Sequence, residues 1–146
     1  RGLGDVYKRQ GHKTTANILK RKAFTVSMAE AGQVVACDYV GIVSGNKAAD
    51  KFARAGFHAT RSEFVDAPLI DELSVAMECR LKDYNPETSI LRGEIVNVSV
   101  DERVLGENGK VDASKVVPII FDPFNNDYLK VGEKVGNAFS DGKILK

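Results

Sequence analysis

Between residues 73 and 82 every second side chain is apolar, and the side chains between them are polar or small. The apolar set is Leu73, Val75, Met77, Cys79 and Leu81, and the intervening set is Ser74, Ala76, Glu78, Arg80 and Lys82. This period of two predicts a β-strand with one buried face and one wetter face. An amphipathic helix is excluded here, because its apolar positions would recur every three or four residues.

A second strand is predicted from about Ser89 to Val100, where valines at 96, 98 and 100 alternate with polar side chains. The turn-forming residues Asp83, Asn85 and Pro86 separate it from the first strand, so the two segments predict an antiparallel hairpin. Gly93 interrupts the second strand and indicates a bulge, or a bend at a barrel corner.

Further segments extend this pattern. Residues 23–28 predict another strand, residues 116–121 a short one, and residues 122–127 the turn that follows it. No internal repeat is present, and the strands follow one another without long connecting helices. The sequence therefore predicts a mainly β protein, an antiparallel sheet or barrel decorated by short peripheral α-helices.

Two short helices are expected. A hydroxyl of Thr14 or Thr15 would cap the first, which runs through about Arg21, by accepting from the unpaired N–H groups of the first turn. Asn46 would cap the second. Gly56 would end it, since glycine adopts the left-handed conformation without a Cβ penalty.

Composition excludes several function classes. The 146 residues suit one domain, and 21 Lys plus Arg against 20 Asp plus Glu provide no overall field that would select nucleic acid or an anionic membrane. With two cysteines, two histidines and no CxxC or HExxH pattern, neither a disulfide framework nor a metal site is expected. The longest apolar run, residues 32–45, is interrupted and is shorter than the ~20 residues that span a bilayer. Without a recognisable signal peptide, the cytoplasm is the expected location.

The stretch 1–10 shows neither helical nor strand periodicity. It looks like translated adapter sequence, of the kind found at the ends of assembled environmental reads, and is excluded from the fold reasoning as non-native. Residues 11–146 are then the genuine domain, and the gene is expected to lack the coding sequence for its first strands.

The first predicted helix also begins a candidate anion site. Residues 6–29 include seven basic or histidine side chains and no acidic one. Lys13, Thr14 and Thr15 stand where free N–H groups, hydroxyls, a cation and the positive end of the helix dipole would converge. A single phosphate suits such a cluster. From the residues alone the alternative stays open that a threonine only caps the helix and the lysines are solvated.

Other candidates carry weaker signals. Ser44, Gly45 and Asn46 form a polar loop that could offer N–H groups and hydroxyls to a ligand, or that could simply begin a helix. Cys37 and Cys79 lie in apolar surroundings and are expected to be buried, inert thiols. Neither His12 nor His58 has a Ser or Cys partner at a diagnostic spacing, and the acidic residues at 66, 71 and 72 are interpreted as a solvated connection.

An ordered set of short segments resembles a known family. The segments are HKTTANI (12–18), AFTV (23–26), SGNKAADKF (44–52), APL (67–69), EC (78–79), GEI (93–95) and YLKVG (128–132). In order and spacing they are similar to the flavin reductase-like proteins of the flavoredoxin branch. The resemblance covers almost everything from residue 11 to about residue 139.

The resemblance implies an FMN-binding split β-barrel, antiparallel and Greek-key-like, that forms a homodimer with FMN near the subunit interface. It places Lys13, Thr14 and Thr15 near the flavin phosphate, in agreement with the anion argument above. Ser44, Gly45 and Lys51 fall in the family's SG and DKF motif, and the resemblance implies that they line or support the flavin site.

The implied activity is that of an NAD(P)H-dependent oxidoreductase, which passes electrons from NADH or NADPH through bound FMN to an acceptor or a redox partner protein. No general acid or base is required, since the flavin performs the chemistry, and no catalytic residue is assigned. Short flavin reductases of two-component monooxygenases carry a GDH motif where this chain has Glu87, Thr88 and Ser89. That departure favours tightly held FMN over release of free flavin.

Two alternatives remain. The barrel could be a non-enzymatic, flavin-free dimeric binding module on the same fold. It could also be an enzyme similar to the oxidases of vitamin B6 phosphates, but no Arg and Lys pattern beyond the candidate anion site supports that interpretation.

Overall fold

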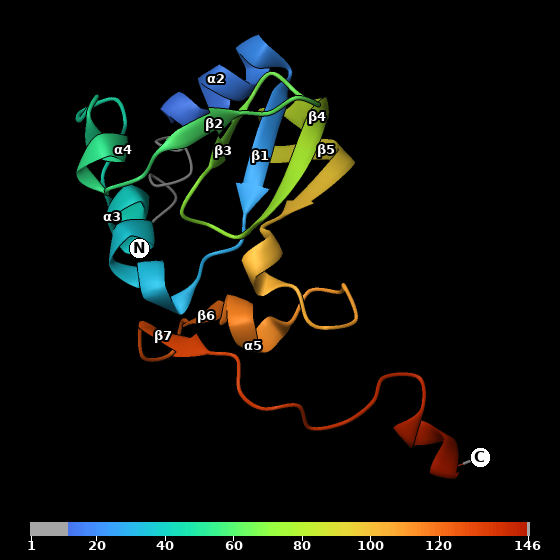
Figure 1. The fold of residues 1–146 in the computed structure, drawn as a ribbon. Coiled ribbons are helices and arrows are strands. Elements are labelled where there is room, and N and C mark those ends of the chain that lie inside the picture. Colours follow the sequence, from blue (N-terminus) through green and yellow to red (C-terminus); the bar gives the residue numbers. More distant parts are fainter. Residues whose placement is uncertain (1–11, 146) are drawn as a thin grey trace.

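The structure, a computed structural model, describes residues 12–145 (Figure 1). The strands of the described chain form three antiparallel sheets, ordered β1–β4–β5, β2–β3 and β6–β7. The strands are β1 (Ala23–Ser27), β2 (Ala59–Arg61), β3 (Pro68–Ile70), β4 (Val75–Asn85), β5 (Ile90–Val100), β6 (Ile119–Asp122) and β7 (Asp127–Lys130). The α-helices are α2 (Lys13–Arg21), α3 (Val34–Ile42), α4 (Lys51–Arg54) and α5 (Ala113–Val116). The 3-10 helices are η2 (Ala31–Gln33), η3 (Glu102–Val104) and η4 (Asp141–Leu145).

The predicted hairpin is confirmed as β4 and β5, which pair from Val75 opposite Val100 to Asn85 opposite Ile90. The first strand runs further than expected, since Asp83 and Asn85 still belong to it. The Asn85 side chain then starts the turn by accepting hydrogen bonds from the backbone N–H groups of Glu87 and Thr88, at 2.8 and 3.1 Å.

The faces of the β1–β4–β5 sheet differ from the prediction. The apolar side chains do share one face, but Val26 and Val98, which flank Met77 from the neighbouring strands, are 43% and 52% exposed. Glu78, expected on the wetter face, is completely buried. The prediction is wrong at Glu78 because the segment between β2 and β3 covers that face, where Val65 and Ala67 pack against the sheet.

The irregularity predicted at Gly93 is present. Gly93 pairs with Leu81, and the strand register shifts between Leu81 and Asp83. The Phe24 ring on β1 occupies the space that a side chain at Gly93 would need. A larger residue at position 93 would therefore overlap the Phe24 ring, which reaches across β4 from β1.

Helix α2 confirms the first predicted helix, but the predicted cap is wrong. The helix begins at Lys13, so His12 occupies the N-cap position, and its side chain accepts no hydrogen bond from the first turn. Thr14 and Thr15 therefore lie inside the first turn. A threonine in helical conformation cannot act as the N-cap, which requires extended backbone.

The second predicted helix is shorter than expected. The Asn46 cap is wrong, because a turn forms there. The Ser44 hydroxyl accepts from the Asn46 N–H at 3.3 Å, and the Ser44 carbonyl accepts from the N–H groups of Lys47 and Ala48, each at 3.0 Å. Helix α4 begins only at Lys51, with Asp50 at its N-cap. Gly56 has a φ of +75°, as expected for the residue that ends a helix.

Two elements depart further from the sequence prediction. Helix α3 was not predicted, because its residues are apolar all round and show no one-sided period. The strand predicted from residue 116 begins only at Ile119. Asp112 caps α5 by accepting from the Ser114 N–H at 2.9 Å, so that Val116 is helical, and Val117, with a φ of +50°, ends that helix.

The hairpin β2–β3 lies across the β1–β4–β5 sheet, and α5 with β6–β7 lies at the end of the sheet opposite α2 (Figure 1). Beyond β7 the chain extends away from all three sheets (Figure 1), and Val135 and Phe139 there are almost fully exposed. None of the helices in the described part of the chain is long and apolar enough to cross a membrane.

Candidate functional site

Two cavities adjoin helix α2. The larger has a volume of about 680 Å³ and lies between α2, β1 and the β2–β3 hairpin. The smaller, of about 460 Å³, lies between the start of α2 and the segment from α3 to α4. Both volumes fall within the range of small-molecule sites. The two cavities share Thr14 and Asn17, which lie three residues apart on one face of α2.

The smaller cavity brings together most of the residues that the sequence singled out. Lys13 and Thr14 line it from α2, and Ser44, Gly45 and Lys51 line it from the opposite side. Thr15 is half-buried and lines neither cavity. Five of the six candidate residues therefore surround one space, although they come from segments about thirty residues apart.

Gly45 lies between the two lysines of this cavity. A Cβ at Gly45 would stand 3.4 Å from Cδ of Lys13 and 3.7 Å from Cε of Lys51. Both lysine chains thus pass beside the backbone of Gly45, at ordinary van der Waals distance from a Cβ placed there. Two cations and the N-terminus of a nine-residue helix border one cavity, which is an arrangement that favours an anion.

The two lysines differ in how their amino groups are used. The Lys51 Nζ donates to the carbonyl oxygens of Val40 and Val43, each at 2.8 Å, and so satisfies carbonyls at the end of α3. An ammonium group has three N–H donors, so one remains for a ligand. Lys13 is exposed, and its amino group donates no hydrogen bond to another described residue.

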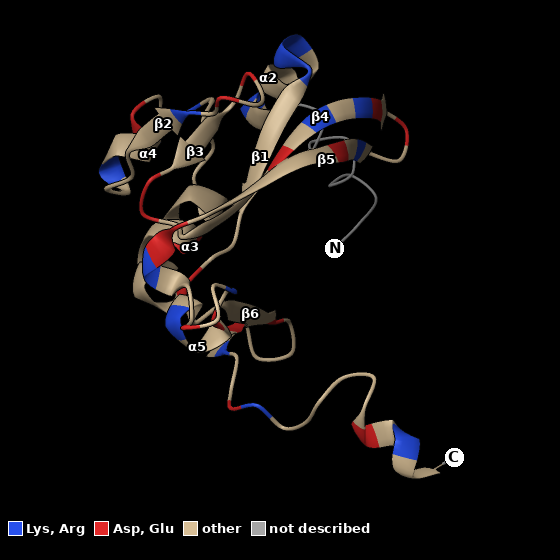
Figure 2. Ribbon diagram, turned by 45° about the vertical axis from the view of Figure 1, so that its right-hand side comes forward, with Lys and Arg blue, Asp and Glu red and all other residues tan. Residues whose placement is uncertain are grey.

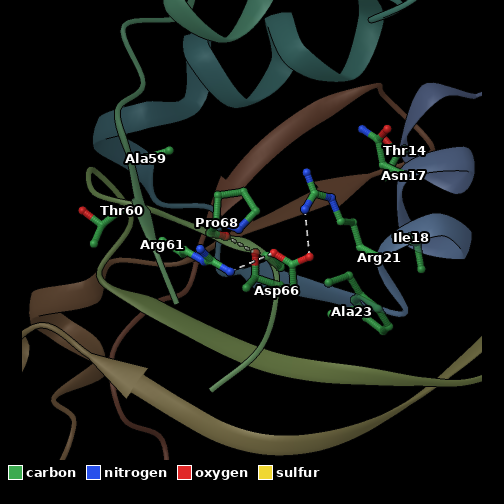
Figure 3. Close-up of a pocket in the computed structure, with 13 residues that line it drawn as sticks. Thr14, Asn17, Ile18, Arg21, Ala23, Ala59, Thr60, Arg61, Asp66 and Pro68 are labelled. Atoms are coloured by element: carbon green, nitrogen blue, oxygen red, sulfur yellow. Dashed lines mark hydrogen bonds and ion pairs between the residues drawn. The ribbon is translucent and has the colours of Figure 1, made fainter. Parts of the chain in front are cut away.

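The larger cavity contains a charged cluster that the sequence did not predict (Figure 3). Arg21 at the end of α2 donates from Nη1 to Oδ2 of Asp66 at 2.8 Å, and Nη2 of Arg61 on β2 lies 3.5 Å from the other carboxylate oxygen. The hydrogen bond from Arg21 lowers the pKa of the Asp66 carboxyl, and the positive charges of both arginines add to this effect.

Asp66 lies in the loop between β2 and β3 with a side chain that is 44% exposed, as expected of a solvated connection, but it is paired with arginines, which was not predicted. Residues 68–70 form β3, and Asp66 joins two arginines that are 45 and 5 residues away. No local pattern marks such a cluster, since only the packing of α2 against the β2–β3 hairpin brings the three side chains together. In the sequence, only the basic triplet at residues 20–22 points to this cluster, and it does not identify Asp66 as the partner of Arg21.

Glu78 stabilises the loop between β2 and β3, which carries Asp66. Its carboxylate accepts a hydrogen bond from Nδ2 of Asn97 at 2.7 Å and short hydrogen bonds from the hydroxyls of Ser62 and Ser99. The Ser62 oxygen in turn accepts from the N–H groups of Phe64 and Val65, each at 3.0 Å. The buried carboxylate thus ties the loop between β2 and β3 to the central sheet.

The charge of Glu78 is stabilised by neutral donors. Burial by itself raises the pKa of the Glu78 carboxyl, but the hydrogen bonds from Ser62, Ser99 and Asn97 outweigh burial and bring the pKa below its usual value. No cation is paired with this carboxylate among the described residues.

Both cysteines are free thiols, and they differ in burial. Burial raises the pKa of the Cys79 thiol, and burial is also the main reason why the pKa of Cys37 is raised. Cys79 is buried as expected, whereas Cys37 on α3 is half-buried. Within residues 12–145 no group of three or more His, Cys, Asp or Glu side chains could hold a metal ion.

His58 takes no part in either cavity. Its ring Nδ1 lies 2.6 Å from Oε1 of Glu72, and its backbone N–H donates to the other oxygen of that carboxylate at 2.9 Å. This pair joins the ends of the β2–β3 hairpin. Glu72 is thus a structural partner and not part of a solvated connection.

Comparison with known proteins identifies the family. The model of the flavin reductase like domain matches residues 6–121. This chain belongs to that family. The match begins inside the stretch 1–10, which lies outside the described residues, and the interpretation of that stretch as non-native remains a prediction.

Two solved flavoredoxins are similar to this flavin reductase-like chain. The flavoredoxin of Desulfovibrio vulgaris (Miyazaki F) is 40% identical, with a TM-score of 0.84 over 90% of this chain and 71% of that one. The flavoredoxin of Methanosarcina acetivorans is 30% identical, with a TM-score of 0.81 over 93% of this chain and 72% of that one. The predicted split barrel of the flavoredoxin branch is confirmed by these similarities.

An uncharacterized protein of Aquifex aeolicus (strain VF5) is 31% identical over 111 residues. The aligned region is 73% of this flavin reductase-like chain and 55% of the Aquifex protein, so the chain spans little more than half of that relative's length.

Proposed function

We propose that this chain binds FMN and works as an oxidoreductase that passes electrons from NADH or NADPH through the flavin to an acceptor. The observation that carries the proposal is the convergence of Lys13 and Lys51 on Gly45, at the entrance of α2. Membership of the flavin reductase like domain family and similarity to two flavoredoxins support the flavin as the ligand.

The residues present fit FMN. The phosphate needs cations and hydrogen-bond donors, which Lys13, the Thr14 hydroxyl and the first turn of α2 supply. The ring system needs a cavity with an apolar lining. The larger cavity, which shares the lining residues Thr14 and Asn17 with the smaller one, has apolar lining residues at Ile18, Phe24 and Pro68, among others.

When bound, the flavin would supply two-electron redox chemistry. The protein's own part would be binding and orientation. Lys13 would neutralise phosphate charge, Ser44 and Gly45 would border the phosphate with backbone N–H groups, and Lys51 would hold that loop against the end of α3. Thr15 would support the first turn of α2 without lining the cavity.

Titration of the protein with FMN and with riboflavin tests the phosphate site, because riboflavin lacks the phosphate. We expect Lys13→Gln to weaken FMN binding about fivefold to tenfold and to leave riboflavin binding unchanged. Lys20→Gln is the matched control, since Lys20 lies on the same helix and lines neither cavity. A protein that takes up no flavin would overturn the proposal.

Anaerobic mixing of the FMN-loaded protein with NADH or NADPH tests the donor. Loss of the flavin's visible absorbance is the expected result. The nucleotide that reduces the flavin at the higher rate is the preferred donor. A flavin-free dimeric binding module would give no absorbance change. The homodimer and the cytoplasmic location remain part of this proposal, and light scattering of the purified protein measures the first.

A further inference from the structure

The last described segment, residues 132–145, is an arm that the rest of the described chain leaves uncovered. All of its residues are exposed, and no hydrogen bond joins it to another described segment. It leads away from the three sheets (Figure 1). Its four large apolar side chains are between 88% and 102% exposed, namely Val135, Phe139, Ile144 and Leu145. Apolar surface gathered and exposed in this way marks an interaction site.

The arm ends in an ordered turn. The Asp141 carboxylate accepts hydrogen bonds from the backbone N–H and Nδ2 of Asn137, at 2.7 and 3.2 Å. The Asn137 carbonyl oxygen accepts from the N–H groups of Ser140 and Asp141, at 3.3 and 3.2 Å. This turn presents the Phe139 ring to solvent, with a φ of +61° at Phe139. A bulky residue is unfavourable in this left-handed region, and such strain persists where packing compensates for it. No packing within the described chain does so, which points to a contact from outside the chain.

A second uncovered apolar surface lies where the arm begins. Ile120 on β6 and Leu129 on β7 are paired across the strands and are 57% and 52% exposed. Val131 follows on the same side of the chain and is 45% exposed. On the opposite side, the Tyr128 hydroxyl donates to Oδ1 of Asp38 on α3 at 2.8 Å, which fastens the hairpin to the body of the protein. Residues 120, 129 and 131, the hairpin face, therefore form an apolar stripe on a fixed support.

The charge of the arm argues for a second copy of this chain as the partner. Acidic and basic residues alternate along the arm (Figure 2), and its two acidic side chains, at 133 and 141, balance the two basic ones at 134 and 143. Nucleic acid or an anionic membrane would select a basic excess, which the arm lacks. A second copy requires no such field, because each copy offers both an uncovered arm and an uncovered hairpin face.

We propose that two copies of this chain exchange arms, so that the arm of each packs on the hairpin face of the other. This inference rests on the homodimer proposed above and assigns its interface. Two-fold symmetry makes each contact occur twice. At roughly 100 Å² for a fully exposed side chain and half of that for a half-exposed one, each copy would bury about 550 Å² of apolar surface. A standard interface buries about 800 Å² per partner, of which roughly 57% is apolar, so the exchange supplies enough.

Sedimentation equilibrium of the full chain measures the dimer dissociation constant. We expect Phe139→Asp and Ile144→Asp each to raise it about thirtyfold, as substitution of a residue at the centre of an interface does. Ile90→Asp is the matched control, since Ile90 is an exposed isoleucine at the start of β5, and it should change the constant less than twofold. Circular dichroism shows that each variant is folded. Arm variants that dimerise as tightly as the control would overturn the proposal, as would a monomeric full chain.

A mixture of two variants tests whether the arm meets the hairpin face of the partner. Leu129→Lys should weaken the dimer as the arm variants do, because it places a charge on the hairpin face. In a mixture with Phe139→Asp, one of the two contacts joins an intact arm to an intact face, and the other pairs opposite charges. We expect the mixed dimer to be about tenfold tighter than either variant alone. A mixture no tighter than the separate variants would overturn the exchange.

Two further readouts separate the other outcomes. Co-sedimentation with phosphatidylcholine vesicles, with and without phosphatidylserine, tests a lipid surface as the partner. A monomeric chain that binds vesicles through Phe139 would overturn the assignment to a second copy. The FMN titration is read from the flavin's visible absorbance, so a dimer that binds no FMN would fail the proposed flavin chemistry and keep the exchange. A monomer that binds FMN would do the reverse.

Discussion

The Phe24 ring packs directly against Gly93, so that a Cβ added to Gly93 would overlap Cζ and Cε1 of Phe24. The two residues sit on β1 and β5, which both pair with β4. The absence of a side chain at Gly93 therefore sets how an aromatic residue can lie on the central sheet. Since Phe24 also lines the larger cavity, this packing affects the candidate site.

Gly93→Ala is expected to destabilise the protein by about 1–3 kcal/mol, the usual cost of overpacking. The Phe24 ring must move, and the Arg80 carbonyl oxygen, 3.3 Å from the added Cβ, limits the other direction. Urea unfolding measures the change. Gly132→Ala is the control, because nothing lies within 4 Å of a Cβ there, and an equal loss in both variants would contradict this account.

Removal of the Glu78 carboxylate should be costly. Glu78→Ala leaves the hydroxyls of Ser62 and Ser99 and the Asn97 amide without their buried acceptor, and we expect a loss of about 1–3 kcal/mol or more in unfolding free energy. Glu94→Ala, which breaks only an exposed pair with Lys82, should cost less than about 1 kcal/mol. Equal effects would show that Glu78 does not fasten the loop.

Glu78 also predicts a pH dependence. Its folded pKa lies below the usual value, so the stability that it contributes is present above about pH 4.3, the unfolded value, and is lost as pH falls through the folded pKa. Urea unfolding between pH 7 and acid pH should show a smaller decrease for Glu78→Gln than for the parent protein. Parallel curves would contradict the lowered pKa.

His58 should titrate above its ordinary pKa. The hydrogen bond to Glu72 raises the pKa of the ring, and the negative charge of that carboxylate adds to the effect. The stability from this pair is complete below about pH 6.5, the unfolded value, and is lost as pH rises through the higher folded pKa. NMR titration measures it, and Glu72→Gln should lower the value. A His58 pKa insensitive to that substitution would disprove the pairing.

Lys51 is expected to stabilise the fold through its hydrogen bonds to carbonyls at the end of α3. Lys51→Met keeps the aliphatic chain and removes the donors to Val40 and Val43, which should cost about 1–2 kcal/mol and speed amide exchange at the end of α3. Lys47→Met, in the turn that precedes α4, is the control, since Lys47 lines neither cavity. Unchanged exchange in α3 would contradict the structural role of Lys51.

The period-two pattern of residues 73–82 was sufficient to predict the central hairpin, because alternation is a local property of a strand. The same pattern wrongly predicted that Glu78 lies on a solvent-exposed face of the sheet. Which face of a sheet is covered depends on a segment that the pattern does not include, here the loop that carries Val65 and Ala67.

The candidate site was also only partly predictable from the sequence. Lys13, Thr14, Ser44 and Gly45 could be proposed from helix-start chemistry and short motifs, and the structure places them around one cavity. The role of Lys51 as a donor to carbonyls at the end of α3 could not be predicted, because α3 itself has no one-sided apolar period.

The amino-acid sequence alone determined the β-rich character of this chain, its central hairpin and the basic, hydroxyl-bearing start of its first helix, since each follows from residues close together in the chain. Tertiary structure alone decided that Arg21, Arg61 and Asp66 meet, and that Glu78 is buried. Those contacts join residues up to 45 positions apart, and only the packing of α2 and the β2–β3 hairpin against the central sheet can create them.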